Sequence, residues 1–150
     1  MPAEIKSLVI VGASGHLGEA VLPEFLKSSL QVSVLARPDS KASFPEGVTI
    51  IRASTSNATE LEAALKGQDA IVSLLSDVGI QEALLEAAKK AGVKWFVPSE
   101  FGHDTSDPLV MDLPIPLFKA KDDFRKKLDE SGLGWTGIIP GMFFDWVSPC

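Results

Sequence analysis

Residues 9–18 of this chain, Val-Ile-Val-Gly-Ala-Ser-Gly-His-Leu-Gly, decide the fold that the sequence predicts. The apolar run before Gly12 indicates a buried strand, and the pattern after Gly15 indicates a helix beginning at about His16. Gly12 permits a tight turn, Gly15 lets backbone approach a pyrophosphate, and Gly18 lets the helix pack close to the sheet. The free amides and the positive end of the helix dipole would face whatever binds there. The sequence therefore predicts a dinucleotide phosphate site on this turn.

The glycine spacing of this turn is G-x-x-G-x-x-G, which differs from the G-x-G-x-x-G of the commonest dehydrogenase fingerprint. The alternative interpretation is a turn that needs glycine only for its own geometry. The strand before the turn and the helix after it favour the binding interpretation. We expect Ser14, His16 and Leu17 to lie at the cofactor together with the three glycines.

Short apolar runs alternate with helical patterns along the whole chain. The expected strands are residues 7–11, 31–36, 48–51, 69–75, 93–97 and 134–139. The expected helices are residues 16–29, a short one around 61–65, 80–91 and 117–130, with a loop over 101–116. Strands that are apolar almost throughout suit a parallel sheet covered on both faces. Residues 1–150 therefore predict one NAD(P)-binding α/β domain, a doubly wound parallel sheet of the Rossmann type with about six strands.

The composition narrows the class of partner and compartment. The chain has 150 residues, 45% of them hydrophobic and 23% charged, as in one ordinary globular domain. A net charge of −6 gives no electrostatic basis for binding nucleic acid. We see no signal-peptide pattern and no apolar run near the roughly 18 residues of a membrane span. The single cysteine, Cys150, rules out a disulfide framework, which fits a reducing compartment. We therefore expect a cytoplasmic protein. We expect neither a membrane partner nor a metal site.

The end of the second expected strand indicates which dinucleotide is bound. An acidic residue about 20 positions after the glycine turn would bind the ribose 2′-hydroxyl of NAD, whereas an arginine suits the 2′-phosphate of NADP. Arg37 stands at this position, with Lys41 close by. A guanidinium can bind phosphate through two hydrogen bonds, and an ammonium adds a point charge. Asp39 follows Pro38 and is assigned to the turn; a solvated arginine at a strand end is the alternative interpretation of Arg37.

Further polar groups follow the fourth and fifth expected strands, and a basic helix comes after them. We expect contacts with the cofactor from Ser76 and from the strand end Pro98, Ser99, Glu100 and Phe101.

On the helix, Phe124 and Leu128 share the buried face with Lys121, because they lie at i+3 and i+7 from it. Lys121 therefore points near the sheet, whereas Lys126 and Lys127 should be solvated.

These residues together resemble the isoflavone reductase-like and NmrA-like branch of the atypical short-chain dehydrogenase/reductases. The resemblance runs from Lys6 to about Asp145 and rests on the glycine turn, the Arg-Pro after strand two, the Pro-Ser-Glu-Phe-Gly strand end and the Lys-x-x-x-Arg helix. It implies that the chain is the N-terminal, NADP(H)-binding part of such a protein. It also implies that Lys121 is the catalytic base or acid beside the nicotinamide. A Tyr-x-x-x-Lys pair is excluded, because the chain contains no tyrosine.

Two features depart from that family. Its members often have an aspartate after the third strand, where this chain has Arg52-Ala53-Ser54. Members are also longer, with a C-terminal portion that forms much of the substrate pocket. The expectation is thus a fragment, a truncated product or a chain covered by another subunit. The apolar residues near the end favour a homodimer through this segment; they are Met142, Phe143, Phe144, Trp146 and Val147.

Three functional hypotheses remain open from the sequence. The first is an NADP(H)-dependent reductase that transfers hydride to a small aromatic or carbonyl-containing substrate. The second is a redox sensor that binds the dinucleotide without turnover and regulates a partner, as some NmrA-like proteins do. The third is a cofactor-binding remnant that works only as an oligomer. A catalytic role of Lys121 would favour the first.

Overall fold

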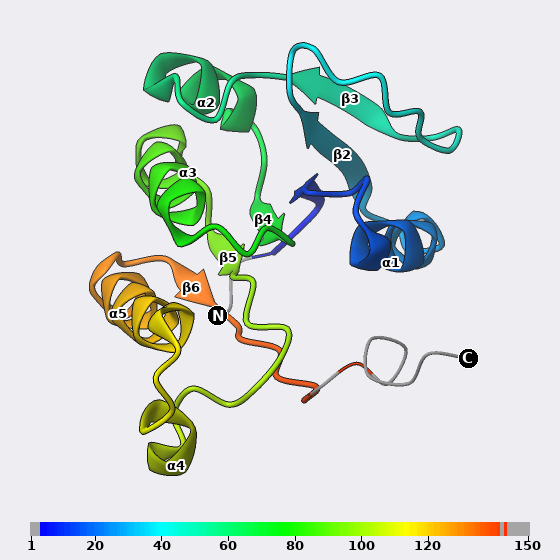
Figure 1. Ribbon diagram of the computed structural model, residues 1–150. Coiled ribbons are helices and arrows are strands. Elements are labelled where there is room, and N and C mark those ends of the chain that lie inside the picture. The colour runs from blue at the N-terminus through cyan, green and yellow to red at the C-terminus, as the bar shows by residue number, and fades with distance from the viewer. Residues whose placement is uncertain (1–3, 142, 144–150) are drawn as a thin grey trace.

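The computed structural model describes residues 4–141 and residue 143 and shows one parallel α/β sheet (Figure 1). Its six strands run in the order β3-β2-β1-β4-β5-β6, and every pair of neighbours is parallel. The strands are β1 (Ser7–Val11), β2 (Gln31–Ala36), β3 (Thr49–Arg52), β4 (Ala70–Ser73), β5 (Trp95–Val97) and β6 (Gly134–Trp135). The helices are α1 (His16–Leu26), α2 (Ala58–Leu65), α3 (Val78–Ala91), α4 (Pro108–Met111) and α5 (Pro116–Glu130). This architecture confirms the predicted doubly wound fold.

Helices cover the sheet from both sides, but unequally. Helices α2, α3 and α5 stack along one face, and α1 packs against the other face beside β1 and β2 (Figure 1). Along β1, Val9 and Val11 belong to the core under α2, α3 and α5, while Leu8 and Ile10 belong to the core under α1. This alternation explains why β1 is apolar throughout, because successive side chains of a strand point to opposite faces.

The strand order reverses between β1 and β4, since β2 and β3 lie on one side of β1 and the later strands on the other. Ligands of open α/β sheets bind beyond the carboxyl ends of the strands at such a reversal. The glycine turn after β1 and the ends of β4 and β5 are therefore brought to one edge, which we call the carboxyl edge.

At the opposite edge, which we call the amino edge, one side chain links the starts of three strands. Asp69 Oδ2 accepts hydrogen bonds from the backbone amides of Lys6 (2.8 Å) and Ser7 (3.1 Å), and Asp69 Oδ1 pairs with Lys94 Nζ at 2.6 Å. The Ser7 hydroxyl lies 3.2 Å from Asp69 Oδ2 and also donates to the Gly67 carbonyl. The hydrogen bond from Lys94, followed by those from the two amides, holds the pKa of Asp69 well below its usual range. This network joins the starts of β1, β4 and β5.

The largest differences between the observed elements and the sequence prediction are three. The strand predicted over 134–139 pairs only at Gly134 and Trp135, because its partner β5 ends at Val97, before Pro98, which has no amide hydrogen. Helix α1 ends at Leu26 instead of residue 29, where the Ser28 hydroxyl donates to the Phe25 carbonyl.

The loop predicted over 101–116 contains the short helix α4, whose first turn Asp107 caps through the Leu109 amide. Asn57 caps α2 by accepting its first amides, and Gly92 ends α3 with a φ of +78°.

None of the helices in the described part of the chain is long and apolar enough to cross a membrane. Four residues of the apolar terminal segment predicted to mediate a dimer lie outside the described residues; these are Met142, Phe144, Trp146 and Val147. The fifth, Phe143, is half-buried.

Candidate functional site

The turn between β1 and α1 has the geometry that its glycines predict. Gly12 has a φ of +88°, and the Gly15 amide donates to the Gly12 carbonyl at 3.1 Å, which closes the turn. Helix α1 begins directly after Gly15 and has no side-chain cap. Asn57, Asp77 and Asp107 each accept an amide at the start of α2, α3 and α4. The first amides of α1 have no such partner, as an anion site requires; α5, which begins with Pro116, has no side-chain cap either.

The glycines of this turn serve different purposes. A Cβ on Gly18 would lie 2.5 Å from the Ala13 backbone, so the helix could not pack where it does. A Cβ on Gly15 would meet only the Gly12 carbonyl oxygen, at 3.4 Å, and Gly15 has an ordinary φ of −87°. The protein's own atoms therefore require glycine at position 18 but leave position 15 open. The open side of Gly15 is exposed, as are Ser14 and His16, which fits a ligand that approaches the backbone closely.

Two cavities at the carboxyl edge meet at the glycine turn. The first, which we call the Arg37 cavity, measures about 270 Å³, and its lining includes Gly12, Ser14, Arg37, Ser40, Phe44 and Thr55. The second, the Lys121 cavity, measures about 330 Å³, and its lining includes Gly12, Gly15, His16, Leu17, Gly18, Ser76, Ser99, Phe101 and Lys121. Gly12 is common to both, so a phosphate bridge over the turn would place one end of a dinucleotide in each cavity.

Arg37 and Lys41 do not share a cavity. Arg37 is exposed and lines the Arg37 cavity, whereas Lys41 lines a separate hollow of about 430 Å³ beside α1. The two hollows have Ala13, Ser14 and Phe44 in common. The structure thus brings Arg37, but not Lys41, to the end of β2 where the sequence predicts a 2′-phosphate.

The Pro-Ser-Glu-Phe-Gly segment contributes to the Lys121 cavity with some of its residues. Ser99 and Phe101 line the cavity, whereas Pro98 and Glu100 are buried and do not line it. The Ser99 amide donates to the Oε1 atom of the buried Gln81 at 2.8 Å, which ties the end of β5 to α3. Pro98 and Glu100 therefore support the site from behind and do not reach its surface.

Lys121 lies on the inner face of α5, as predicted from its spacing to Phe124 and Leu128. Its side chain is buried, with 7% of the residue exposed, and it lines the cavity that contains the glycine turn. Burial lowers the pKa of the Lys121 amine from its ordinary 10.5, the charge of Glu100 opposes this shift, and that of Arg125 adds to it. A buried amine of this kind can exchange a proton closer to neutral pH than a surface lysine can.

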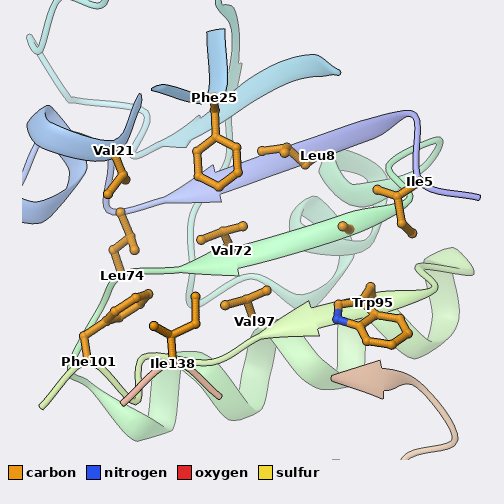
Figure 2. A pocket seen from close by; sticks show the side chains of 11 residues that line it. Ile5, Leu8, Val21, Phe25, Val72, Leu74, Trp95, Val97, Phe101 and Ile138 are labelled. Atoms are coloured by element: carbon orange, nitrogen blue, oxygen red, sulfur yellow. The ribbon is translucent and has the colours of Figure 1, made fainter. Parts of the chain in front are cut away.

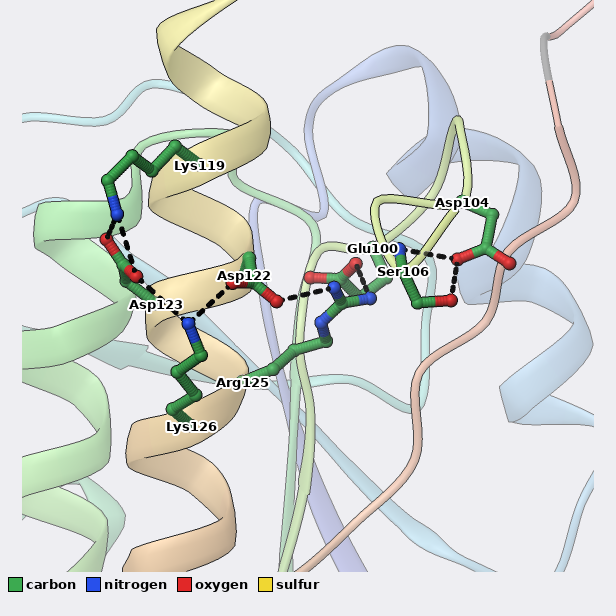
Figure 3. A network of polar contacts seen from close by, with 8 residues as sticks. All are labelled: Glu100, Asp104, Ser106, Lys119, Asp122, Asp123, Arg125 and Lys126. Carbon is green, nitrogen blue, oxygen red and sulfur yellow. Dashed lines mark hydrogen bonds and ion pairs between the residues drawn. The ribbon is translucent and has the colours of Figure 1, made fainter. Parts of the chain in front are cut away.

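The buried Glu100 lies close to the half-buried Arg125 (Figure 3), and the charges of both act on Lys121. Arg125 Nη1 lies 3.8 Å from Glu100 Oε2, and Arg125 Nη2 lies 3.1 Å from Asp122 Oδ1. Glu100 is 1% exposed, and its Oε2 atom has no hydrogen-bond partner among the described residues. Burial raises the pKa of this carboxyl above its ordinary 4.5, and the charges of Lys121 and Arg125 oppose the shift.

The other lysines of α5 lie in solvent with acidic partners, as the helical spacing predicts. Lys119 Nζ pairs with Asp123 at 2.9 Å and Lys126 Nζ with Asp122 at 2.7 Å (Figure 3), while Lys127 Nζ pairs with Glu82 at 2.6 Å. Lys121 forms no ion pair with any residue in the described ranges.

A larger apolar cavity of about 440 Å³ lies on the α1 side of the sheet (Figure 2). Its floor is formed by strand residues such as Val72 and Val97, and Phe25 of α1 stands at its border (Figure 2). Leu74 and Phe101 line both this cavity and the Lys121 cavity. The apolar face thus continues into the site that holds Lys121.

Several lining residues were missed by sequence reasoning. Ser40 and Phe44 lie in the irregular β2–β3 connection, and Thr55 follows the strand end where an aspartate is expected in relatives. Leu75 and Ile80 bring apolar surface to the same cavity from the β4–α3 connection and α3. None of these belongs to a recognisable motif; the position beyond each strand end is the only signal that could have pointed to them.

Comparisons with known proteins identify the family of this chain. The model of the NmrA-like family matches residues 4–148. The chain is 34% identical to an oxidoreductase named aprR of Aspergillus flavus over 92% of its length, and 31% identical to the isoflavone reductase homologue IRL of Zea mays over 99%. These matches cover 49% and 52% of the relatives, so the chain spans about half the length of the curated proteins it matches.

Solved structures show the same fold. One is described as AtPrR2 with NADP⁺ and (+)-pinoresinol; it has a TM-score of 0.84 and 27% identity, over 96% of this chain and 52% of that one. Another is the binary complex of leucoanthocyanidin reductase with NADPH from Vitis vinifera; it has a TM-score of 0.74 and 28% identity, over 89% of this chain and 49% of that one. With a family model that matches nearly its whole length, this chain belongs to the NmrA-like family.

Proposed function

We propose that this chain binds NADP(H) and carries the proton-transfer residue of a reductase whose substrate is a small aromatic or carbonyl-containing compound. The observation that carries the proposal is Lys121, a buried amine without an ion-pair partner in the described residues, which lines the same cavity as the glycine turn. The relatives crystallised with NADP⁺ or NADPH support the choice of cofactor.

The residues present fit a dinucleotide. The uncapped start of α1 and the open side of Gly15 would accept the pyrophosphate, and Arg37 would bind the 2′-phosphate in the Arg37 cavity. The nicotinamide end would then lie in the Lys121 cavity. When bound, the cofactor supplies or accepts the hydride.

The chain's own contribution to the reaction is positioning and a proton. Lys121 would donate a proton to the substrate oxygen during reduction, or accept it in the reverse direction. The lowered pKa of its amine eases that exchange near neutral pH. Phe101 and Leu74, which connect the Lys121 cavity to the apolar face, would favour an aromatic or otherwise apolar substrate.

The alternative is binding without turnover, as in a redox sensor. Only Lys121 distinguishes the two functions, because a sensor needs the glycine turn and Arg37 but no proton donor. NADPH consumption should therefore be followed with a panel of quinones, enones and phenylpropanoids for the wild type and for Lys121→Met, which keeps most of the length of the side chain and removes the amine. Lys119→Met is the matched control, because Lys119 is exposed and only two residues away.

A reductase predicts that Lys121→Met lowers turnover by about 10²–10⁴-fold while the Kd for NADPH stays within about threefold. Lys119→Met should leave both unchanged. Turnover that survives Lys121→Met would contradict the catalytic assignment. NADPH binding by the wild type, with no turnover on any substrate of the panel, would favour the sensor.

A further inference from the structure

The connection between β2 and β3, residues 37–48, carries Arg37 and Ser40 to the Arg37 cavity without a helix or strand of its own. A tight turn begins it, in which the Ser40 amide donates to the Arg37 carbonyl at 3.1 Å. The Ala42 amide then donates to the Ser40 hydroxyl at 3.3 Å. These local bonds shape the turn, but they do not attach it to the sheet.

Arg52, the last residue of β3, makes that attachment. Its Nη1 atom donates to the Ser40 carbonyl at 2.9 Å and to the Arg37 carbonyl at 3.2 Å. One guanidinium nitrogen thus holds both ends of the turn from which the Arg37 side chain extends. Arg52 pairs with Ala36 across the β2–β3 ladder, so a regular strand fixes its own position.

The two arginines near this turn have no acidic group of the described residues within ion-pair distance. Neither Arg37 nor Arg52 forms an ion pair there, although Asp39 lies in the same turn. Two guanidinium groups held on one turn repel each other, and a bound dianion relieves that repulsion. Arg52 does not line the Arg37 cavity, so its hydrogen bonds act on the turn and not on a ligand in the cavity.

We propose that Arg52 is a positioning residue for recognition of a nucleotide 2′-phosphate, because it holds the Arg37–Ser40 turn in the place where Arg37 reaches the phosphate. This inference rests on the proposed NADP(H) function and adds a residue that determines specificity through Arg37. Nothing in the local sequence marks Arg52 for this role, since it comes 15 residues after Arg37. A free 2′-phosphorylated adenosine nucleotide contains the recognised group and should report on the same site.

The test is a double-mutant cycle on NADPH and NADH affinity, measured by titration calorimetry on the full chain. Arg52→Ala should weaken NADPH by about tenfold and leave NADH within about twofold. In an Arg37→Ala background, Arg52→Ala should have little further effect on NADPH, because the side chain that it positions is gone. Adenosine 2′,5′-bisphosphate should show the same pattern as NADPH. Lys90→Ala is the control, since Lys90 is an exposed lysine near the end of α3, without an ion pair among the described residues.

Each outcome decides between specific alternatives. Equal loss of NADPH and NADH affinity, together with a lower melting temperature, would mean that Arg52 supports the fold only, and full additivity with Arg37→Ala would mean that it contacts the phosphate itself. Either result, or no effect of Arg52→Ala in the wild type, overturns the positioning role. Failure of the wild type to prefer NADPH, or an Arg37→Ala variant that binds NADPH normally, would instead overturn the proposed function.

Discussion

The carboxylates at the two edges of the sheet differ in how many hydrogen-bond and ion-pair partners they have. At the amino edge, Asp69 accepts two backbone amides and pairs with Lys94 at 2.6 Å. At the carboxyl edge, Glu100 is 1% exposed, its nearest cation is 3.8 Å away, and Oε2 accepts no hydrogen bond from the described residues. The pKa of Asp69 is accordingly lowered and that of Glu100 raised. The carboxylate of Asp69 is thus satisfied by its neighbours, whereas one oxygen of the buried Glu100 is not.

The cations follow the same division. Most lysines and arginines form ion pairs with described residues. Those that form none in the described ranges are Arg37, Lys41, Arg52, Lys90 and Lys121. All of these except Lys90 lie at or beyond the carboxyl ends of strands or line the cavities there. In a protein of net charge −6, this local excess of unpaired positive charge is the feature that suits an anionic cofactor.

The largest effect on the carboxyl edge is expected from Gly15→Val. The backbone at position 15 accepts a side chain, since an added Cβ meets only the Gly12 carbonyl oxygen at 3.4 Å, but the new methyl groups would occupy the pyrophosphate site. NADPH affinity should fall by more than about a hundredfold, with little change in the melting temperature. Titration calorimetry measures the NADPH affinity, and thermal unfolding measures the melting temperature. Normal NADPH binding by the variant would mean that the phosphate site lies elsewhere.

A smaller loss is expected from Arg37→Ala. Charged hydrogen bonds to phosphate contribute roughly 1.5–3 kcal/mol, so NADPH affinity should fall by about ten- to a hundredfold. NADH lacks the 2′-phosphate and should bind nearly as well to the variant as to the wild type. Competition titrations of the two dinucleotides measure the ratio. Equal losses would show that Arg37 supports the fold instead.

A substitution at the amino edge should lower the stability of the protein and leave NADPH binding unchanged. Asp69→Asn keeps one acceptor oxygen but loses the charge opposite Lys94, so we expect a loss of about 1 kcal/mol in the free energy of unfolding at pH 7. Because the folded-state pKa lies below the ordinary 3.8, this stabilisation is present above pH 3.8 and disappears as the pH falls through the lower folded value.

Urea unfolding of wild type and variant at pH 7, 5 and 3 measures the difference. The gap between the two proteins should narrow at pH 3, and the Kd for NADPH should be unchanged at pH 7. A variant that loses NADPH affinity without losing stability would break the contrast between the edges.

The features that could be predicted from the sequence are those that depend on residues close together in the chain. The glycine turn is a contiguous motif, and helical spacing alone places Lys121 on the buried face with Phe124 and Leu128. The hydrogen bonds of Arg52 and the burial of Glu100 depend on contacts between segments distant in sequence, which no local pattern carries. The sixth strand was predicted too long because its apolar residues continue to Ile139, while its partner strand ends at Val97.

Binding of the dinucleotide at the carboxyl edge alone can be measured by a titration of ¹⁵N-labelled protein with NADPH, followed by two-dimensional NMR. Amide shifts should concentrate in residues 12–18, in the turn at residues 37–40 and near Ser99. The amides of Ser7 and Asp69 at the amino edge should keep the chemical shifts that they have in the unbound protein. Shifts centred on the amino edge, or no saturable shifts in residues 12–18, would mean that the dinucleotide does not bind at the carboxyl edge.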